Sequence, residues 1–152
     1  PSASQGLLPD DRAARLSPVK VVVHVDGGAR GNPGPAAVAA VASTPEGEKL
    51  AERKLYIGEA TNNVAEYRAV LLGLELARDL GAEEVEVIND SELIARQIGG
   101  EYKVKHAGLK PLFAEAMREL RGFHKWAVRP VRREQNARAD ELVNEALDEA
   151  LA

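Results

Sequence analysis

A ten-residue stretch that follows a short apolar run constrains the fold of this chain more than any other segment. The run, Val21 to Val23, is β-branched and typical of a buried strand. Residues 26–35 then read DGGARGNPGP, with four glycines and two prolines. Glycine permits backbone conformations that other residues avoid, and proline fixes φ and removes an amide donor. The sequence therefore predicts a strand from Lys20 to Asp26, followed either by an elaborate hairpin turn or by a backbone that a ligand approaches closely.

The rest of the chain predicts further strands and helices in an α/β order. Two segments with β-strand composition, 36–44 and 49–57, flank the turn sequence PEGE and predict an antiparallel meander with the first strand. The later elements follow from apolar periodicity and from capping residues. They are a helix from Thr61 or Asn62 to Gly81, a strand over 84–89, a short helix over 91–98 capped by Asp90 or Ser91, a helix over 109–120, a strand over 126–131 and a last helix capped by Asn136. The predicted order is βββαβααβα, a five-stranded mixed sheet flanked by helices.

Composition places this pattern in one globular domain. A chain of 152 residues that is 45% apolar is long enough for a single core without a stabilising metal or disulfide. The absence of cysteine excludes a disulfide framework, a thiolate zinc site and a cysteine nucleophile. The sequence has no apolar run of about 18 residues and no signal-peptide pattern at its start. We therefore expect a soluble cytoplasmic protein, with a flexible tail over residues 1–18 and a domain over residues 19–152.

Charge is distributed unevenly along the chain. The formal net charge is −4, yet residues 103–133 contain nine Lys or Arg and only two acidic residues. Such a segment can bind phosphates even on an acidic protein. It can equally be the solvated face of a helix. The charge pattern by itself leaves both interpretations open.

Four acidic residues stand apart because each is predicted at the end of an element. Asp26 closes the first strand, and Asp90 follows the fourth. Glu66 and Asp140 lie in the predicted first turns of the first long helix and of the last helix. In open α/β sheets the functional crevice forms where strand ends and helix starts converge, so a common carboxylate cluster is predicted. The alternative for each acid alone is a solvated side chain that interacts with a helix dipole.

Four blocks around these acids resemble the type 1 ribonuclease H family. The blocks are DGGARGNPGP, TNNVAEYRAVLLGL, NDSELIARQ and REQNARADELVNEAL, in that order along the chain. Each block contains one of the four acids, and the resemblance extends from about Val21 to the C-terminus. It implies the ribonuclease H-like fold, whose element order agrees with the order predicted above.

The resemblance implies a metal-dependent site. Its ligands are four carboxylates that bind two Mg²⁺ ions, with Mn²⁺ as a substitute: Asp26, Glu66, Asp90 and Asp140. Two unit charges about 5 Å apart at an effective dielectric constant of about 20 repel by roughly 3 kcal/mol, so such a cluster needs cations to stay ionised. Hard oxygen ligands also favour Mg²⁺ or Mn²⁺ over zinc.

The resemblance also implies an activity, namely endonucleolytic cleavage of the RNA strand of RNA/DNA hybrids to leave 5′-phosphate and 3′-hydroxyl ends. Discrimination of RNA from DNA requires contacts to 2′-hydroxyls, and binding to sugar and phosphate makes affinity salt-dependent. The implied contacts on the RNA side are Gly27, Gly28, Ala29, Asn62 and Glu66, those on the DNA side are Asn32, Thr61 and Asn63, and Arg30, Ser91, Lys103, Lys105 and Asn136 complete the nucleic-acid-binding set.

Two features differ from the pattern of many family members. Only GGEYKVKHAG joins the second and third predicted helices, where many members carry a lysine-rich protrusion that improves hybrid binding. Lys103 and Lys105 are the candidates to replace this protrusion in part. The loop before Asp140 reads RPVRREQN and lacks the histidine of the better-known bacterial members, so Arg133 is the candidate for its place. Unless it is a plain surface residue, Arg133 would act electrostatically, because an arginine is no base at neutral pH.

Several functions remain open at this point. The leading hypothesis is a metal-dependent endoribonuclease, ribonuclease H, which binds an RNA/DNA hybrid as a monomer and binds no membrane. A related fold acting on double-stranded RNA, or as a 3′ exonuclease, is a second hypothesis. A non-catalytic hybrid-binding module is a third, although clustered acids would only repel its ligand. In some relatives of the family this domain is fused to another, and the same is possible here.

Overall fold

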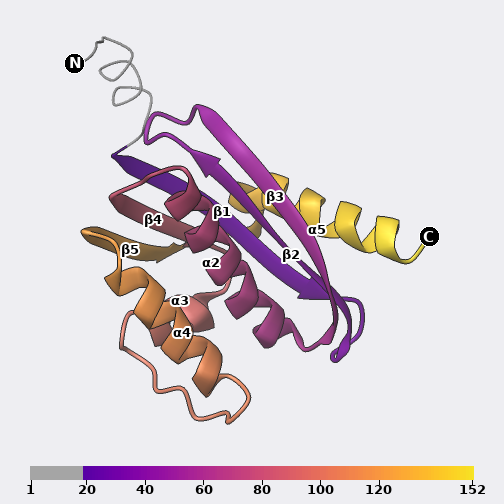
Figure 1. Ribbon diagram of the computed structural model, residues 1–152. Coiled ribbons are helices and arrows are strands. Elements are labelled where there is room, and N and C mark those ends of the chain that lie inside the picture. The colour runs from indigo at the N-terminus through magenta and orange to yellow at the C-terminus, as the bar shows by residue number, and fades with distance from the viewer. Residues whose placement is uncertain (1–18) are drawn as a thin grey trace.

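The computed structural model describes residues 19–152, and the expected tail over residues 1–18 lies outside this range. Its centre is one five-stranded sheet with the strand order β3-β2-β1-β4-β5 (Figure 1). The strands are β1 (Lys20–Ala29), β2 (Gly34–Ser43), β3 (Lys49–Ala60), β4 (Glu84–Asn89) and β5 (Lys125–Pro130). The first three strands pair as an antiparallel meander, and β4 and β5 extend the sheet in parallel with β1. The predicted mixed sheet is confirmed.

The helices cover the sheet in the predicted order. They are α2 (Asn62–Asp79), α3 (Glu92–Ile98), α4 (Lys110–Arg121), a single 3₁₀ turn η1 (Arg133–Asn136) and α5 (Ala137–Ala150). Helices α2, α3 and α4 lie on one face of the sheet, and α5 crosses the other face (Figure 1). Within residues 19–152 no helix is both long and apolar enough to cross a membrane.

The two faces of the sheet bury separate cores. On the first face, Val23 and Val25 of β1 pack against α2. On the second face, Ala37 and Ala39 of β2 pack against α5. Strand β2 is therefore buried on both sides, and its alanine-rich composition allows two helices to approach the same strand.

Small residues bring α2 close to β1. The helix stripe that faces the sheet is buried and repeats every fourth position: Ala65, Ala69, Gly73 and Ala77. A Cβ atom on Gly73 would lie 2.5 Å from Cγ1 of Val25, and one on Gly27 would lie 2.2 Å from the carbonyl oxygen of Ala65. Glycine is therefore required at both positions for the helix to contact the strand. Because Ala65 contacts β1 in this way, Glu66, which follows Ala65 in the helix, lies beside the same strand.

The structure corrects the predicted end of the first strand. Strand β1 does not stop at Asp26 but continues to Ala29, because Gly27 and Gly28 pair with β2. The turn itself occupies only residues 30–33. Pairing with a neighbouring strand thus outweighs the low strand propensity of glycine. Asp26 consequently lies within extended backbone instead of at the start of a loop.

The structure also decides the predicted helix caps. Thr61 rather than Asn62 caps α2, since its hydroxyl accepts a hydrogen bond from a backbone amide three residues later at 3.2 Å. Ser91 rather than Asp90 caps α3 in the same way. Asn136 occupies the N-cap position of α5 as predicted, but its side chain makes no capping hydrogen bond. Its side chain is directed into the protein, where it has a different role.

Candidate active site

The ends of β1 and β4 do not coincide, and the difference creates a recess at the edge of their pairing. The parallel pairing of β1 with β4 ends at His24 and Ile88, whereas β1 continues to Ala29. In this register Asp90, which follows β4, is level with Asp26. A pocket of about 310 Å³ lies here, with walls from β1, α2, the end of β4, η1 and α5.

Acidic side chains converge in this pocket. One oxygen each of Asp26, Glu66 and Asp90 lie within 4.8 Å of one another, and all three residues are half-buried. Asp140, in the first turn of α5, lines the same pocket, and its proximity contributes to the raised pKa of Asp26. Glu66 lies one turn deeper in α2 than predicted, because the helix already begins at Asn62. The four acids thus share one pocket although they are far apart in the sequence.

Burial and mutual repulsion raise the affinity of these acids for protons. Burial, followed by the charges of the other three acids, raises the pKa of Asp26 to about 8. Burial, together with the charge of Asp90, raises the pKa of Glu66 to about 7, against the opposing effects of Ser91 and Arg133. Burial also raises the pKa of Asp90. Near neutral pH, therefore, this pocket holds protons where a cation is not available.

The donor set fits hard divalent cations. Carboxylate oxygens are the ligands that Mg²⁺ and Mn²⁺ prefer, and none of the described residues that line the pocket is a histidine. A cation among the acids would offset their repulsion and allow all of them to ionise. The residues that could hold such ions are Asp26, Glu66, Asp90 and Asp140.

Arg133 brings a positive charge to the same pocket. It begins η1, lines the pocket with an exposed side chain, and its charge opposes the rise that burial causes in the pKa values of Glu66 and Asp90. A cation at this position can interact with an anionic ligand of the pocket. The electrostatic role predicted for Arg133 is compatible with this location and stays a prediction.

Asn136 supports the pocket from within the protein. It is 2% exposed, and its Nδ2 donates to the carbonyl oxygen of Val25 at 2.8 Å. A hydrogen bond from the same side chain opposes the rise that burial causes in the pKa of Asp90. The predicted contact of Asn136 with nucleic acid therefore does not hold for its side chain, because burial denies a ligand access to it.

Two buried polar contacts that support the site have no signal in the sequence. The Oδ1 atom of Asn89 accepts from the Ser91 amide at 2.8 Å and so fixes the turn that carries Asp90. The Tyr67 hydroxyl donates to Oε1 of Gln97 at 2.5 Å, with both side chains buried, and so joins α2 to α3. Asparagine and glutamine are usually exposed, and only tertiary contacts reveal these as internal.

Three residues of α5 line the pocket but were not predicted as site residues from the sequence. Val143, Asn144 and Leu147 follow Asp140 at spacings of three, four and seven residues, which places them on the same side of the helix. This spacing was a usable signal. It was missed because two of the three residues are apolar, which is typical of core positions.

The turn after β1 is joined to the start of α2. The Ala29 amide donates to Oδ1 of Asn62 at 2.9 Å, and the Asn62 amide donates to Oδ1 of Asn32 at 3.1 Å. Asn62 lines the pocket, and Thr61 and Asn63 flank it in the chain. These hydrogen bonds hold the backbone of two predicted contact segments against each other.

Other predicted contacts lie outside the pocket. Lys103 and Lys105 are exposed on the segment between α3 and α4, which contains no regular helix or strand, and neither lines the pocket. Glu92, the first residue of α3, pairs with Arg96 at 3.0 Å one turn later. Its charge therefore has a local partner on the helix surface.

Known proteins share both the sequence pattern and this geometry. A family model described as reverse transcriptase-like matches residues 24–146. Ribonuclease HI of Halobacterium salinarum is 42% identical over 149 residues, which cover 96% of this chain and 75% of that relative. The bifunctional protein Rv2228c of Mycobacterium tuberculosis is 47% identical over 133 residues, which cover 87% of this chain. The aligned residues cover only 36% of Rv2228c, a much longer protein.

Solved structures agree with these matches. LC11-RNase H1, solved in complex with an RNA/DNA hybrid, aligns with a TM-score of 0.83 at 47% identity, covering 87% of this chain and 99% of that chain. A mixed sheet with a carboxylate pocket at its central strands, matched by the family model, defines a reverse transcriptase-like domain. Within that class, the chain belongs to the ribonuclease HI family.

Proposed function

We propose that this chain is a metal-dependent endoribonuclease that hydrolyses the RNA strand of RNA/DNA hybrids. The observation that carries the proposal is the convergence of Asp26, Glu66 and Asp90 within 4.8 Å in one pocket. Membership of the ribonuclease HI family supports it, as does the similarity to LC11-RNase H1, which was solved with such a hybrid.

The proposed cofactors are two Mg²⁺ ions, with Mn²⁺ as a substitute, held by Asp26, Glu66, Asp90 and Asp140. When bound, such ions supply the positive charge that activates a water molecule and stabilises the leaving 3′ oxygen. The expected products carry 5′-phosphate and 3′-hydroxyl ends. Asp26 interacts with all three other acids, so we expect its loss to affect the whole set.

The protein's own groups would orient the cleaved strand. Gly28 and Ala29 line the pocket and present backbone without bulky side chains, which suits close contact with a ribose. Asn62, held between the β1 end and the following turn, is the candidate to interact with a 2′-hydroxyl, the group that separates RNA from DNA. Arg133 would stabilise negative charge on the phosphate or the leaving group.

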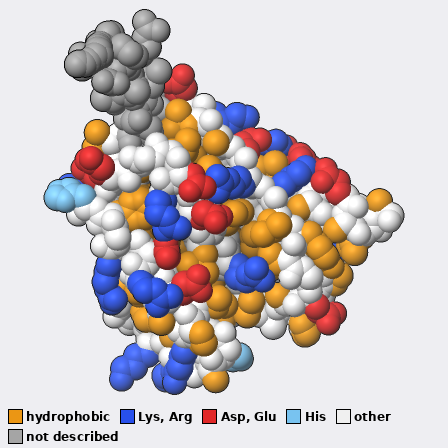
Figure 2. All heavy atoms as spheres, viewed as in Figure 1, with side chains coloured by type: hydrophobic (Ala, Val, Ile, Leu, Met, Phe, Trp, Pro, Cys, Tyr) orange, Lys and Arg blue, Asp and Glu red, His pale blue; other side chains and the backbone are white. Residues whose placement is uncertain are grey.

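Binding of a duplex needs more surface than the pocket. Lys and Arg side chains gather over α4 and the segment before it, at the lower end of the view in Figure 2. This region belongs to the basic stretch 103–133. We propose that it interacts with the sugar–phosphate backbone and that Lys103 and Lys105, both exposed, take part.

One assay tests the proposed activity against its alternatives. The purified protein is incubated with labelled RNA/DNA hybrid, double-stranded RNA and DNA duplex, each with Mg²⁺, Mn²⁺ or EDTA, and the product ends are mapped. We expect internal cuts in the RNA strand of the hybrid that require a divalent ion. Cuts in double-stranded RNA alone would favour the related nuclease, and binding without cutting would favour a hybrid-binding module.

A second assay tests the basic segment. Lys103→Ala combined with Lys105→Ala should weaken hybrid binding and reduce its salt dependence by roughly two phosphate contacts. The control is Lys20→Ala combined with Lys49→Ala, which removes the same charge. These two lysines begin β1 and β3, at the edge of the sheet away from the pocket, so their loss should change neither hybrid affinity nor its salt dependence. Equal effects of the two double variants would show that Lys103 and Lys105 have no special role.

A further inference from the structure

The pocket extends beyond the carboxylates along β1. Its far part, here called the Arg30 arm, is lined by Ala29 at the end of β1, by Arg30 of the following turn and by Val143, Asn144 and Leu147 of α5. None of these five residues is acidic. The Arg30 arm therefore offers an interaction different from that of the acid cluster.

Arg30 faces the same side of β1 as Asp26. Asp26 and Gly28 pair with Ala39 and Ala37 on the face of the sheet that α5 covers, and Arg30, the first residue of the turn, contacts α5 on the same face. The four steps from Asp26 to Arg30 span about 13 Å. Gly28 has no side chain, and even a Cβ atom there would meet nothing nearer than Cγ1 of Val143 at 3.9 Å. The backbone between the acids and Arg30 is therefore open to an extended ligand.

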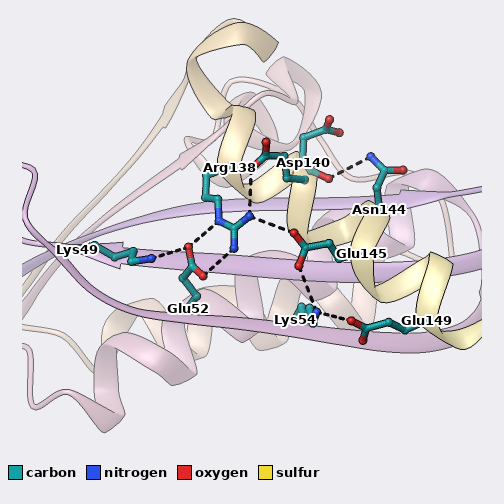
Figure 3. A network of polar contacts seen from close by, with 9 residues as sticks. Lys49, Glu52, Lys54, Arg138, Asp140, Asn144, Glu145 and Glu149 are labelled. Carbon is teal, nitrogen blue, oxygen red and sulfur yellow. Dashed lines mark hydrogen bonds and ion pairs between the residues drawn. The ribbon is translucent and has the colours of Figure 1, made fainter.

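Two residues of α5 hold the Arg30 guanidinium. Its Nη2 donates to Oδ1 of Asn144 at 3.2 Å and pairs with Oδ1 of Asp148 at 2.7 Å. Asn144 also donates to the carbonyl oxygen of Asp140 at 3.1 Å (Figure 3). Arg30 is thus connected through one side chain to the helical turn that carries an acid of the site.

The guanidinium keeps capacity for another ligand. Both contacts described within residues 19–152 use Nη2, so Nε and Nη1 remain to donate to a further acceptor. The Arg30 side chain is 40% exposed and that of Asp148 is 69% exposed, so solvent weakens their ion pair. The planar fork of an arginine matches the paired oxygens of a phosphate.

We propose that Arg30, oriented by Asn144 and Asp148, binds a backbone phosphate of the RNA strand beyond the phosphate that is cleaved. The inference rests on the proposed function, because it takes the cleaved strand to cross the carboxylates. An RNA strand that continues from the acids along the open backbone of β1 would meet a positive charge at Arg30. Arg30 is then a substrate contact, and Asn144 and Asp148 are positioning residues.

The test measures binding of a labelled RNA/DNA hybrid over a series of salt concentrations, in an Asp26→Asn background to prevent cleavage. Arg30→Ala is expected to weaken binding by about tenfold and to reduce the slope of log K against log salt by about one contact. Arg30→Lys keeps the charge but loses the planar fork, so its slope is retained while its affinity is intermediate.

Arg53→Ala is the matched control. Arg53 is 35% exposed and also pairs with two acids, Glu75 and Asp79, but it does not line the pocket. Its loss should leave hybrid affinity and salt slope unchanged. Asp148→Ala should weaken binding less than Arg30→Ala and add nothing in the Arg30→Ala background, because it acts only through that arginine. Equal effects of Arg30→Ala and Arg53→Ala, or an additive effect of Asp148→Ala, would overturn the proposal.

Cleavage by the unmodified protein separates this inference from the proposed function. If the protein cuts the hybrid while Arg30→Ala binds like Arg53→Ala, only the Arg30 contact is wrong. If it cuts no hybrid while Arg30→Ala still lowers affinity and slope, the proposed function is wrong and the phosphate contact stands.

Discussion

Two groups of charged side chains adjoin α5, and they differ in how each acid is compensated. One is the pocket, where four acids meet beside β1. The other, here called the β3–α5 network, joins Glu52 and Lys54 of β3 to Arg138, Glu145 and Glu149 of α5 (Figure 3). Both groups connect a strand to the same helix, but of these two groups only the network has acids that form ion pairs with Lys or Arg within residues 19–152.

The acids of the β3–α5 network are stabilised in their charged form. Arg138 binds the two oxygens of Glu52 at 2.8 and 3.0 Å, and Lys54 binds Glu145 and Glu149 at 3.2 and 2.8 Å. The hydrogen bond with Arg138 lowers the pKa of Glu52 to about 2. In the pocket the same type of side chain shows the opposite shift, with the pKa of Asp26 raised to about 8.

The contrast teaches that the surroundings of an acid indicate its role better than its presence does. Acids with cation partners on the surface contribute modestly to holding elements together. Half-buried acids without such partners destabilise the free fold and are explained by a ligand that brings positive charge. The pocket is therefore the group in which substitutions should affect function most.

The largest expected difference between the two groups is in cleavage. Asp26→Asn should reduce cleavage of the hybrid by at least about a thousandfold, equivalent to ~4 kcal/mol of barrier, because it removes the acid whose pKa all three other acids raise. Glu52→Gln removes an acid of the β3–α5 network and should leave cleavage unchanged. Initial rates on labelled hybrid with Mg²⁺ measure both. Comparable losses in the two variants would erase the functional distinction between the groups.

The next effect concerns packing beneath the pocket. Gly27→Ala should destabilise the fold by about 3 kcal/mol, because the added Cβ atom would lie 2.2 Å from the Ala65 carbonyl oxygen and displace α2 with Glu66. Gly28→Ala is the control, since its Cβ atom has no neighbour closer than 3.9 Å. Thermal unfolding of the two variants should show a lowered Tm for Gly27→Ala only. Similar Tm values would mean that α2 can move away without cost.

Arg133→Ala should lower kcat by roughly tenfold to a hundredfold, because it removes a positive charge that acts on Glu66 and Asp90 within the pocket. The neighbouring Arg132→Ala removes an exposed arginine that does not line the pocket, and it should leave kcat unchanged. Steady-state kinetics on the hybrid distinguish the two. Full turnover by Arg133→Ala would remove this residue from the site.

The two groups should also give opposite dependences of stability on pH. The Asp26 pKa rises from its ordinary 3.8 to about 8 on folding, so metal-free protein should lose stability as pH rises from about 4 to about 8. The Glu52 pKa falls from its ordinary 4.5 to about 2, so its contribution is lost as pH falls from about 4.5 through 2. We expect Asp26→Asn in EDTA to flatten the slope of Tm above pH 5, by up to about 4 °C per pH unit.

Magnesium sharpens the same comparison. Ions that bind the ionised acids should stabilise the protein more at pH 8 than at pH 6, since fewer protons compete for the pocket. Glu52→Gln should leave this gain intact and change only the acidic limb of the Tm curve. A Tm gain from Mg²⁺ that is the same at both pH values would contradict the raised pKa values of the pocket.

The smallest expected effect is that of Arg138→Ala. The network is exposed to solvent, so its loss should lower Tm by no more than about 4 °C and leave cleavage of the hybrid unchanged. Thermal unfolding and the cleavage assay measure both. A large loss of cleavage would instead show that the network positions Asp140, which lies two residues after Arg138 on the same helix.

The order of elements and the grouping of the acids were predictable from local signals. Strand composition, the turn residues around the PEGE segment and the helical spacing after Thr61 are each contained in short windows. The boundaries were less predictable. The continuation of β1 past Asp26 depends on pairing with β2, which glycine-rich sequence does not reveal.

The role of individual residues depended still more on distant contacts. Gly27 was expected to allow a ribose to approach, and the structure shows that the approach of the Ala65 carbonyl already requires glycine there. Asn136 was expected to contact nucleic acid, but its side chain is buried and interacts with Asp90. The contact of Asn144 with Arg30 joins residues 114 positions apart, so no local signal predicts it.

By itself, therefore, the sequence determined the types of the elements and their order, and it singled out the four acids as one group, because periodicity and turn chemistry act over a few residues. Only the tertiary structure decided that β1 extends beyond the end of β4, that α2 contacts β1 through small residues, and that α5 holds Arg30. The physical reason is that burial, repulsion and pairing are properties of atoms brought together in space, and no window of the chain contains both partners.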